Sequence, residues 1–118
     1  MSQQAPTGVG TAAPIPVIEL GGTHVTAGWV SPDGWRFMGP AHHRAIAYGG
    51  SAQDILMTVI GAGSGLRASP GSRWTMAVPG PFDYGQGIAR YRGVGKFDDL
   101  DGVDVGAALR VGLRASAV

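Results

Sequence analysis

The sequence predicts an α/β fold, in which an antiparallel meander of strands joins a mixed sheet and helices pack against it. Three observations favour this class. An apolar run at 15–20 passes through a Gly-Gly-Thr corner into an alternating run at 24–30, which is typical of a β-hairpin. A second apolar run at 74–78 ends abruptly at a Pro-Gly-Pro sequence. Apolar residues at helical spacing occur at 55–60 and again at 105–113.

The composition limits what the chain can do. Its 118 residues make one small domain, rich in tight turns because 21 residues are glycine. The net charge is +1 and the basic residues are scattered, so we expect no nucleic-acid partner. No apolar run approaches membrane-spanning length, so we expect no membrane partner. The chain has no cysteine, which excludes disulfides and cysteine-ligated zinc within it.

The first 14 residues are predicted to form a disordered tail, ahead of a folded part at 15–118. They are rich in Ser, Gln, Ala, Pro, Thr and Gly, and they lack the basic start and apolar stretch of a signal peptide. We therefore expect a cytoplasmic location.

The Gly-Gly-Thr corner of the first hairpin is a candidate anion site. Gly21 and Gly22 permit left-handed backbone and let N–H groups converge on an anion, while Thr23 adds a hydroxyl donor. Glu19 stands just before the corner, where a carboxylate could hold a hydrated divalent cation beside a phosphate. The alternative is that the glycines serve only the turn.

This hairpin resembles the first phosphate motif of the actin-like ATPase superfamily, and in particular that of the ROK family (repressors, open reading frames, kinases). Chains of that family open with an apolar strand, an acid and Gly-Gly-Thr, although the acid is usually Asp where this chain has Glu19. The resemblance implies the N-terminal lobe of an actin-like, ribonuclease H-like fold. It also implies ATP as cofactor, Mg²⁺ held through water near Glu19, and a sugar as substrate.

A third strand is predicted at 35–44, after a Ser-Pro-Asp-Gly turn at 31–34. The Gly39–Pro40 pair should bend it. The adjacent histidines at 42–43 point to opposite faces of a strand, which favours solvent-facing imidazoles over metal ligands.

The first helix should begin after Ser51, because Ser51 and Asp54 have the spacing of a capping box. Three glycines, Gly61, Gly63 and Gly65, are expected to stop or fray it. A Gly/Ser/Pro-rich surface loop follows as far as residue 72.

The Pro-Gly-Pro sequence extends the resemblance. ROK kinases have a strand that ends in a Pro-Gly-Pro loop, with an acid and a glycine close behind, and this loop lies against the sugar. The chain supplies Pro79, Gly80 and Pro81, then Asp83 and either Gly85 or Gly87. A proline-clamped turn with a bare glycine lets backbone approach a hydroxyl-rich ligand closely. The alternative is an ordinary Pro-Gly turn.

Gly95, Lys96 and Phe97 are further sugar-binding candidates, because the family carries groups toward the sugar at this position. Lys96 could meet a phosphate, although an exposed lysine in such a loop is usually only solvated. Asp104 is a plausible N-cap for the last helix, at 105–113.

The resemblance covers nearly the whole chain from Ile15 onward, yet it assigns no catalytic residue. In the family, the catalytic aspartate lies on the strand that follows this last helix. We therefore expect the N-terminal part of a ROK-type, ATP-dependent hexose kinase, inactive by itself, whose full-length relatives are homo-oligomers. The alternative is a non-catalytic truncated ROK-like protein or a sugar-binding module.

Overall fold

The computed structural model describes residues 13–34, 36–46, 49–95 and 97–118. The predicted tail therefore lies almost wholly outside the described residues, as do Trp35 and Lys96. The elements are, in chain order, β1 (Ile15–Leu20), β2 (His24–Ser31), β3 (Arg36–Ala45), α1 (Ala52–Ser64), β4 (Thr75–Ala77), β5 (Phe82–Asp83), β6 (Ile88–Ala89), the 3-10 helix η1 (Asp98–Leu100) and α2 (Val105–Leu113).

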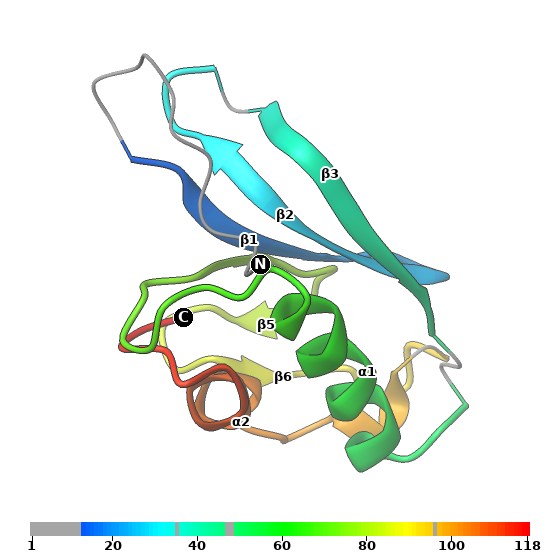
Figure 1. Ribbon diagram of the computed structural model, residues 1–118. Helices are drawn as coiled ribbons and strands as arrows, with labels where there is room; N and C mark the ends of the chain where they lie inside the picture. Colours follow the sequence, from blue (N-terminus) through cyan, green and yellow to red (C-terminus); the bar gives the residue numbers. More distant parts are fainter. Residues whose placement is uncertain (1–12, 35, 47–48, 96) are drawn as a thin grey trace.

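The first four strands form one mixed sheet in the order β3-β2-β1-β4 (Figure 1). β1 pairs with β2, and β2 with β3, in antiparallel register, whereas β4 runs parallel to β1. The predicted antiparallel meander of β1, β2 and β3 is confirmed. The prediction that the strand near 74–78 joins the same sheet is also confirmed, by β4. A separate two-stranded sheet of β5 and β6 follows.

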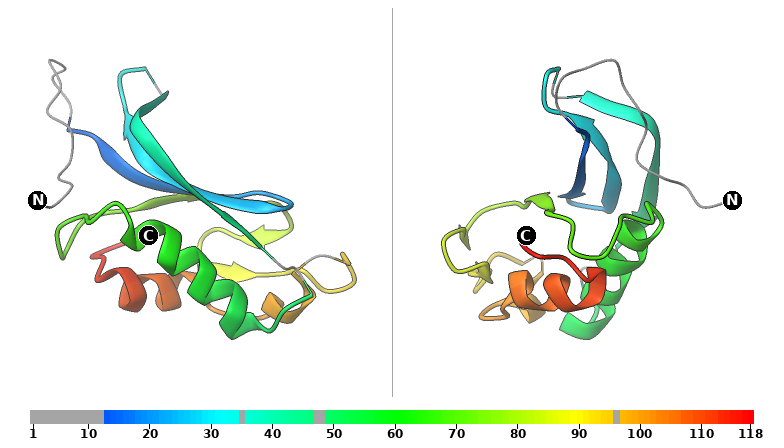
Figure 2. Two further views of the ribbon diagram at one scale, coloured as in Figure 1. Left: turned by 45° about the vertical axis from the view of Figure 1, so that its right-hand side comes forward. Right: turned by 60° about the vertical axis from the view of Figure 1, so that its left-hand side comes forward.

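Both α-helices pack against the same face of the four-stranded sheet (Figures 1 and 2). That face carries every second residue of each strand, so Ile18 and Val25 are 1% and 0% exposed. Ile55 of α1 and Leu109 of α2 pack into the same core. Glu19 belongs to the alternate set and is exposed.

The predicted bend in the third strand is a β-bulge. The register between β2 and β3 shifts between Ala27 and Trp29, opposite Gly39, whose φ of +73° only glycine adopts readily.

The start of α1 follows the predicted capping pattern. The Ser51 hydroxyl accepts a hydrogen bond from the Asp54 N–H at 3.1 Å. The Asp104 carboxylate likewise accepts from the Ala107 N–H at 2.9 Å and begins α2.

The expectation that the three glycines stop or fray α1 is confirmed for Gly65 alone. The helix continues through Gly61 and Gly63, and Gly65 is its C-cap. A Cβ built on Gly63 would lie 2.9 Å from Leu113 Cδ2 and 3.1 Å from Ile18 Cδ1. Close packing therefore places a glycine inside the helix, and this packing outweighs the low helix propensity.

None of the helices among the described residues has both the length and the apolar character needed to cross a bilayer.

Candidate functional site: the hairpin corner and the Pro-Gly-Pro loop

The Gly-Gly-Thr corner is the turn between β1 and β2, and backbone hydrogen bonds hold its shape. The Gly21 N–H donates to the His24 carbonyl oxygen at 2.8 Å, and the Thr23 carbonyl accepts from the Ile46 N–H at 2.9 Å. The Gly21 donor is thus used inside the hairpin. The N–H groups of Gly22 and Thr23 donate to no other described residue, and both residues are exposed.

The corner does not use the left-handed backbone that we expected of its glycines. Positive φ values occur at other glycines of the described chain, but neither Gly21 nor Gly22 is among them. Space explains Gly21 instead, because a Cβ there would lie 3.1 Å from the His24 carbonyl oxygen.

The Thr23 hydroxyl lies 2.8 Å from His24 Nδ1. This contact places an imidazole beside the corner. Together the hydroxyl, the ring and the N–H groups of Gly22 and Thr23 give the corner several polar atoms within a short stretch of chain.

Glu19 lies on the sheet face opposite the helices, in register with Thr26 of β2 and Ala77 of β4. The described residues contain no group of three or more His, Cys, Asp or Glu that could cage a metal ion. Mg²⁺ commonly keeps several waters and takes one or two carboxylates together with phosphate oxygens from its substrate. Glu19 is a single exposed carboxylate two residues before the candidate anion corner, as this pattern requires.

The Pro-Gly-Pro loop directly follows β4, and its Gly80–Pro81 peptide bond is cis. The Pro81 carbonyl accepts from the Arg90 N–H at 3.3 Å. The Tyr91 hydroxyl donates to the Pro79 carbonyl oxygen at 2.8 Å. The loop is therefore anchored on both sides of Gly80 by the chain that follows β6.

Tyr91 is 1% exposed and packs beneath this loop. Burial raises the pKa of Tyr91 from 10.0 to about 12, and charge repulsion from Tyr84 adds to the shift. The phenol therefore stays protonated, and a donor, at every physiological pH.

A pocket of about 140 Å³ joins the two motifs. It is lined by Gly22, Pro79, Gly80, Tyr91, Val94 and Phe97. Gly22 comes from the first hairpin, whereas Pro79 and Gly80 come from the loop after β4. The parallel pairing of β1 with β4 brings these segments together, because both strands end at the same edge of the sheet.

The other predicted sugar-binding residues lie in different places relative to this pocket. Pro81 adjoins the pocket without lining it. Gly95 has φ +86°, and its N–H donates to Asp98 Oδ1 at 3.1 Å, which ties it to η1. Lys96, the remaining candidate, lies outside the described residues. Phe97 lines the pocket at 2% exposure.

Asp83 has a local structural role. Its Oδ1 accepts from the Gln86 N–H at 3.0 Å, and its Oδ2 lies 3.9 Å from an Arg90 guanidinium nitrogen. The Gly87 N–H donates to the Asp83 carbonyl, and Gly87 has φ +75°. The acid and the glycine of this motif thus shape the tight turn between β5 and β6.

Tyr91 and Val94 are the pocket residues that sequence reasoning missed. The available signal was weak: an aromatic residue ending the short apolar run at 88–91. Nothing local shows that this ring turns back beneath the loop before it.

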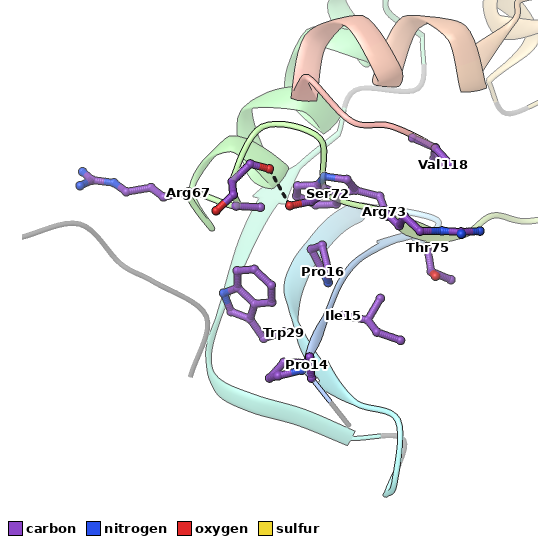
Figure 3. A pocket seen from close by; sticks show the side chains of 14 residues that line it. Pro14, Ile15, Pro16, Trp29, Arg67, Ser72, Arg73, Thr75 and Val118 are labelled. Carbon is purple, nitrogen blue, oxygen red and sulfur yellow. Dashed lines mark hydrogen bonds between the residues drawn. The ribbon is translucent and has the colours of Figure 1, made fainter. Parts of the chain in front are cut away.

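A larger cavity among the described residues lies elsewhere. A groove of about 910 Å³ opens near the start of β1, at the end of that strand away from the Gly-Gly-Thr corner (Figure 3). Its lining includes Ile15, Trp29, Arg73 and Val118. None of the predicted site residues lines it, so volume alone does not identify the candidate site.

Neither a protein-family model nor a curated protein matches this chain. The fold is shared with solved structures, among them two kinases. An inorganic polyphosphate/ATP-glucomannokinase from Arthrobacter sp. strain KM superposes with a TM-score of 0.74 at 20% identity, over 88% of this chain and 42% of that one. A ROK hexokinase from Thermus thermophilus gives 0.56 at 15% identity, over 84% and 32%.

The chain thus spans less than half the length of either neighbour. At these identities the comparisons establish the fold. That fold is an α/β arrangement with a mixed sheet, shared with part of ROK-type sugar kinases, as the two sequence motifs suggested.

Proposed function

We propose that this chain forms the N-terminal lobe of an ATP-dependent hexose kinase of the ROK type, supplying the phosphate corner and the sugar-facing loop. The observation that carries the proposal is the pocket shared by Gly22, Pro79 and Gly80. A phosphate donor and a sugar acceptor must meet within bonding distance, and this pocket is where the two candidate motifs meet.

In this proposal these residues position the phosphate donor and the sugar. Phosphoryl transfer needs little covalent help from the protein, so catalysis rests on alignment and on stabilising charge. The N–H groups of Gly22 and Thr23, which donate to no other described residue, would donate to phosphate oxygens. Mg²⁺, when bound, would neutralise charge on those oxygens, and Glu19 would orient its hydration shell.

The Pro-Gly-Pro loop would present backbone to the sugar. Gly80 is exposed and has no side chain to hold a hydroxyl-rich ring away. Tyr91 fixes the Pro79 carbonyl that bounds the pocket. No described residue is assigned as the general base, so we expect the chain by itself to bind ligands without transferring phosphate.

A cytoplasmic location and a homo-oligomeric full-length protein belong to the same proposal. The phosphoryl donor is to be tested with both ATP and inorganic polyphosphate, since the glucomannokinase neighbour carries both in its name.

The test is an NMR titration of the uniformly ¹⁵N-labelled chain with ATP plus Mg²⁺, polyphosphate, glucose and mannose, each separately. Phosphate ligands should shift the amides of Gly22 and Thr23, and sugars should shift the amide of Gly80. Gly71 and Gly102, which are exposed and lie outside the pocket, serve as reference amides.

Equal shifts at the reference and corner amides would contradict the proposal. Saturable shifts at Gly80 with sugar, together with silence of Gly22 and Thr23 toward every phosphate ligand, would support a sugar-binding module instead.

A further inference from the structure

A pocket of about 180 Å³ lies where the C-terminal ends of α1 and α2 meet. The two helices lie side by side (Figure 2), and Gly112 lets them approach closely, because a Cβ there would lie 2.5 Å from Ile60 Cδ1. The lining includes Arg67 from the chain after α1, Arg114 at the end of α2, and Trp74 just before β4.

Trp74 brings to this pocket a buried hydrogen-bond donor that has no partner. The residue is 5% exposed, and its indole Nε1–H finds no acceptor among the described residues. Native proteins pair the large majority of such buried groups, so an unpaired one indicates a missing ligand or water. An acceptor atom that enters the pocket beside Trp74 would supply the partner.

The charge of the lining is positive. Arg67 and Arg114 are its charged residues, and no described Asp or Glu lines the pocket. Both arginines are exposed, and neither forms an ion pair with a carboxylate of the described chain. A guanidinium group is a rigid fork of donors that matches the oxygens of a phosphate. The pocket therefore favours an oxyanion.

Arg67 and Arg114 also occupy backbone positions that suit glycine. Their φ values are +52° and +53°, a left-handed conformation that glycine usually takes after a helix. Backbone N–H groups already satisfy carbonyls at both helix ends, since the Ser64 carbonyl accepts from Arg67 and the Val111 carbonyl accepts from Arg114. The helix ends therefore do not need the guanidinium groups as donors, and a ligand would explain why arginine stands at both positions.

We propose that this pocket is a binding site for a phosphate group, which accepts hydrogen bonds from the guanidinium groups of Arg67 and Arg114 and from the indole N–H of Trp74. Its volume leaves room for the ion and some of its hydration, since a water molecule takes about 30 Å³ of the liquid. The inference stands apart from the proposed kinase function, because no residue lines both this pocket and the one that joins the hairpin corner to the Pro-Gly-Pro loop.

The experiment follows the indole N–H resonance of Trp74 while the ¹⁵N-labelled 118-residue chain is titrated with inorganic phosphate. The pH is fixed, and sodium chloride keeps the ionic strength constant, so general screening does not change. Trp29 lines the larger groove (Figure 3) but not this pocket, and its indole N–H is the internal reference. We expect a saturable shift of Trp74 and none of Trp29.

Two substitutions separate the ligand site from a purely structural role. Arg67→Gly and Arg114→Gly should each weaken phosphate binding by about tenfold or more, because each removes a charge-assisted donor. Each should leave the Tm unchanged or raise it, because glycine adopts the left-handed backbone without strain. Arg110→Ala is the matched control, since it removes one positive charge from an exposed position of α2 outside the pocket and should leave phosphate binding unchanged.

The same titration with glucose 6-phosphate distinguishes the source of the phosphate group. Equal affinity would make free phosphate the ligand, and tighter binding would make it a phosphate ester; both outcomes support the site. An unshifted Trp74, a shift of Trp29 in its place, or equal weakening by Arg110→Ala would overturn the proposal. Unchanged phosphate binding in the two glycine variants, with a lowered Tm, would assign the arginines to the fold and overturn it as well.

Discussion

The Tyr91 hydroxyl donates a hydrogen bond to the Pro79 carbonyl oxygen at 2.8 Å, and this bond joins the chain after β6 to the loop after β4. The Tyr91 ring also packs near two other rings, with centroids 5.9 Å from Phe97 and 6.3 Å from Phe82. A buried aromatic cluster therefore supports the loop that lines the candidate site.

Replacing Tyr91 with Phe should destabilise the chain by about 1 kcal/mol, because the Pro79 carbonyl loses its donor while the ring packing is kept. Tyr84→Phe is the matched control, since Tyr84 is 71% exposed and its change should stay within about 0.5 kcal/mol. Chemical denaturation measures both. Equal stabilities of the two variants would show that the hydrogen bond contributes nothing.

The pKa of Tyr91 leads to a prediction at alkaline pH. Its folded pKa of about 12 lies above the ordinary 10.0, so unfolding favours loss of the phenolic proton. The protonated Tyr91 phenol therefore contributes to the free energy of unfolding. This contribution is fully present below pH 10 and is lost as the pH rises toward 12. The difference in unfolding free energy between the native chain and Tyr91→Phe should be constant up to about pH 10 and change only above it. A difference that already changes between pH 7 and 9 would contradict this assignment.

Two glycines of α1 should respond oppositely to alanine. At Gly63 a Cβ meets Leu113 and Ile18 in the core, so Gly63→Ala should cost about 1–3 kcal/mol. At Gly61 the three atoms nearest to such a Cβ all belong to the exposed Arg44 side chain, which can move aside. Gly61→Ala should stabilise the helix by up to about 1 kcal/mol. Thermal unfolding of both variants checks the pair, and stabilisation by Gly63→Ala would show that the core has room to spare.

The phosphate corner predicts a set of binding changes. Gly22→Val puts a branched side chain at the exposed corner and should weaken ATP binding by blocking the approach of the phosphates. Glu19→Ala should reduce the Mg²⁺ dependence of that binding, whereas Glu19→Asp, which restores the usual acid of the ROK motif, should keep it. Titrations with and without Mg²⁺ measure both effects. An unchanged Mg²⁺ dependence in Glu19→Ala would leave Glu19 as a solvated carboxylate at the end of a strand.

The purified 118-residue chain should not phosphorylate glucose or related hexoses. Absence of a general base alone typically costs about 10²–10⁴-fold in rate, and the nucleotide would also lack most of its positioning contacts. A coupled assay for ADP release, run beside the NMR titration, measures this. Clear turnover would place the catalytic residues within residues 1–118.

Local chemistry made much of the fold predictable. The alternation of apolar residues gave the hairpin and its faces, because side chains on a strand point to opposite sides. Ser51 and Asp104 marked the two helix starts, since a short oxygen-bearing side chain satisfies the first free N–H groups. Each of these signals lies within a few residues of the feature that it predicts.

The continuation of α1 through Gly63 could not be predicted in the same way. Helix propensity disfavours Gly63, but its place against Leu113 and Ile18 requires a residue without a side chain. Those neighbours come from the far end of the chain and from β1. A packing constraint of this kind is invisible until the three elements are brought together.

The candidate site was also predictable only where its features depend on local sequence. The sequence by itself determined the two motifs, one ending at Thr23 and one beginning at Pro79, because each is a turn whose residue types favour close approach of a ligand to backbone. Only the tertiary structure decided that Gly22 and Gly80 share one pocket. It also decided that the Gly21 N–H donates within the hairpin and that the Tyr91 hydroxyl bonds to the loop. These relations depend on the parallel pairing of β1 with β4 and on burial of an aromatic cluster, which are long-range contacts that no local pattern of residues encodes.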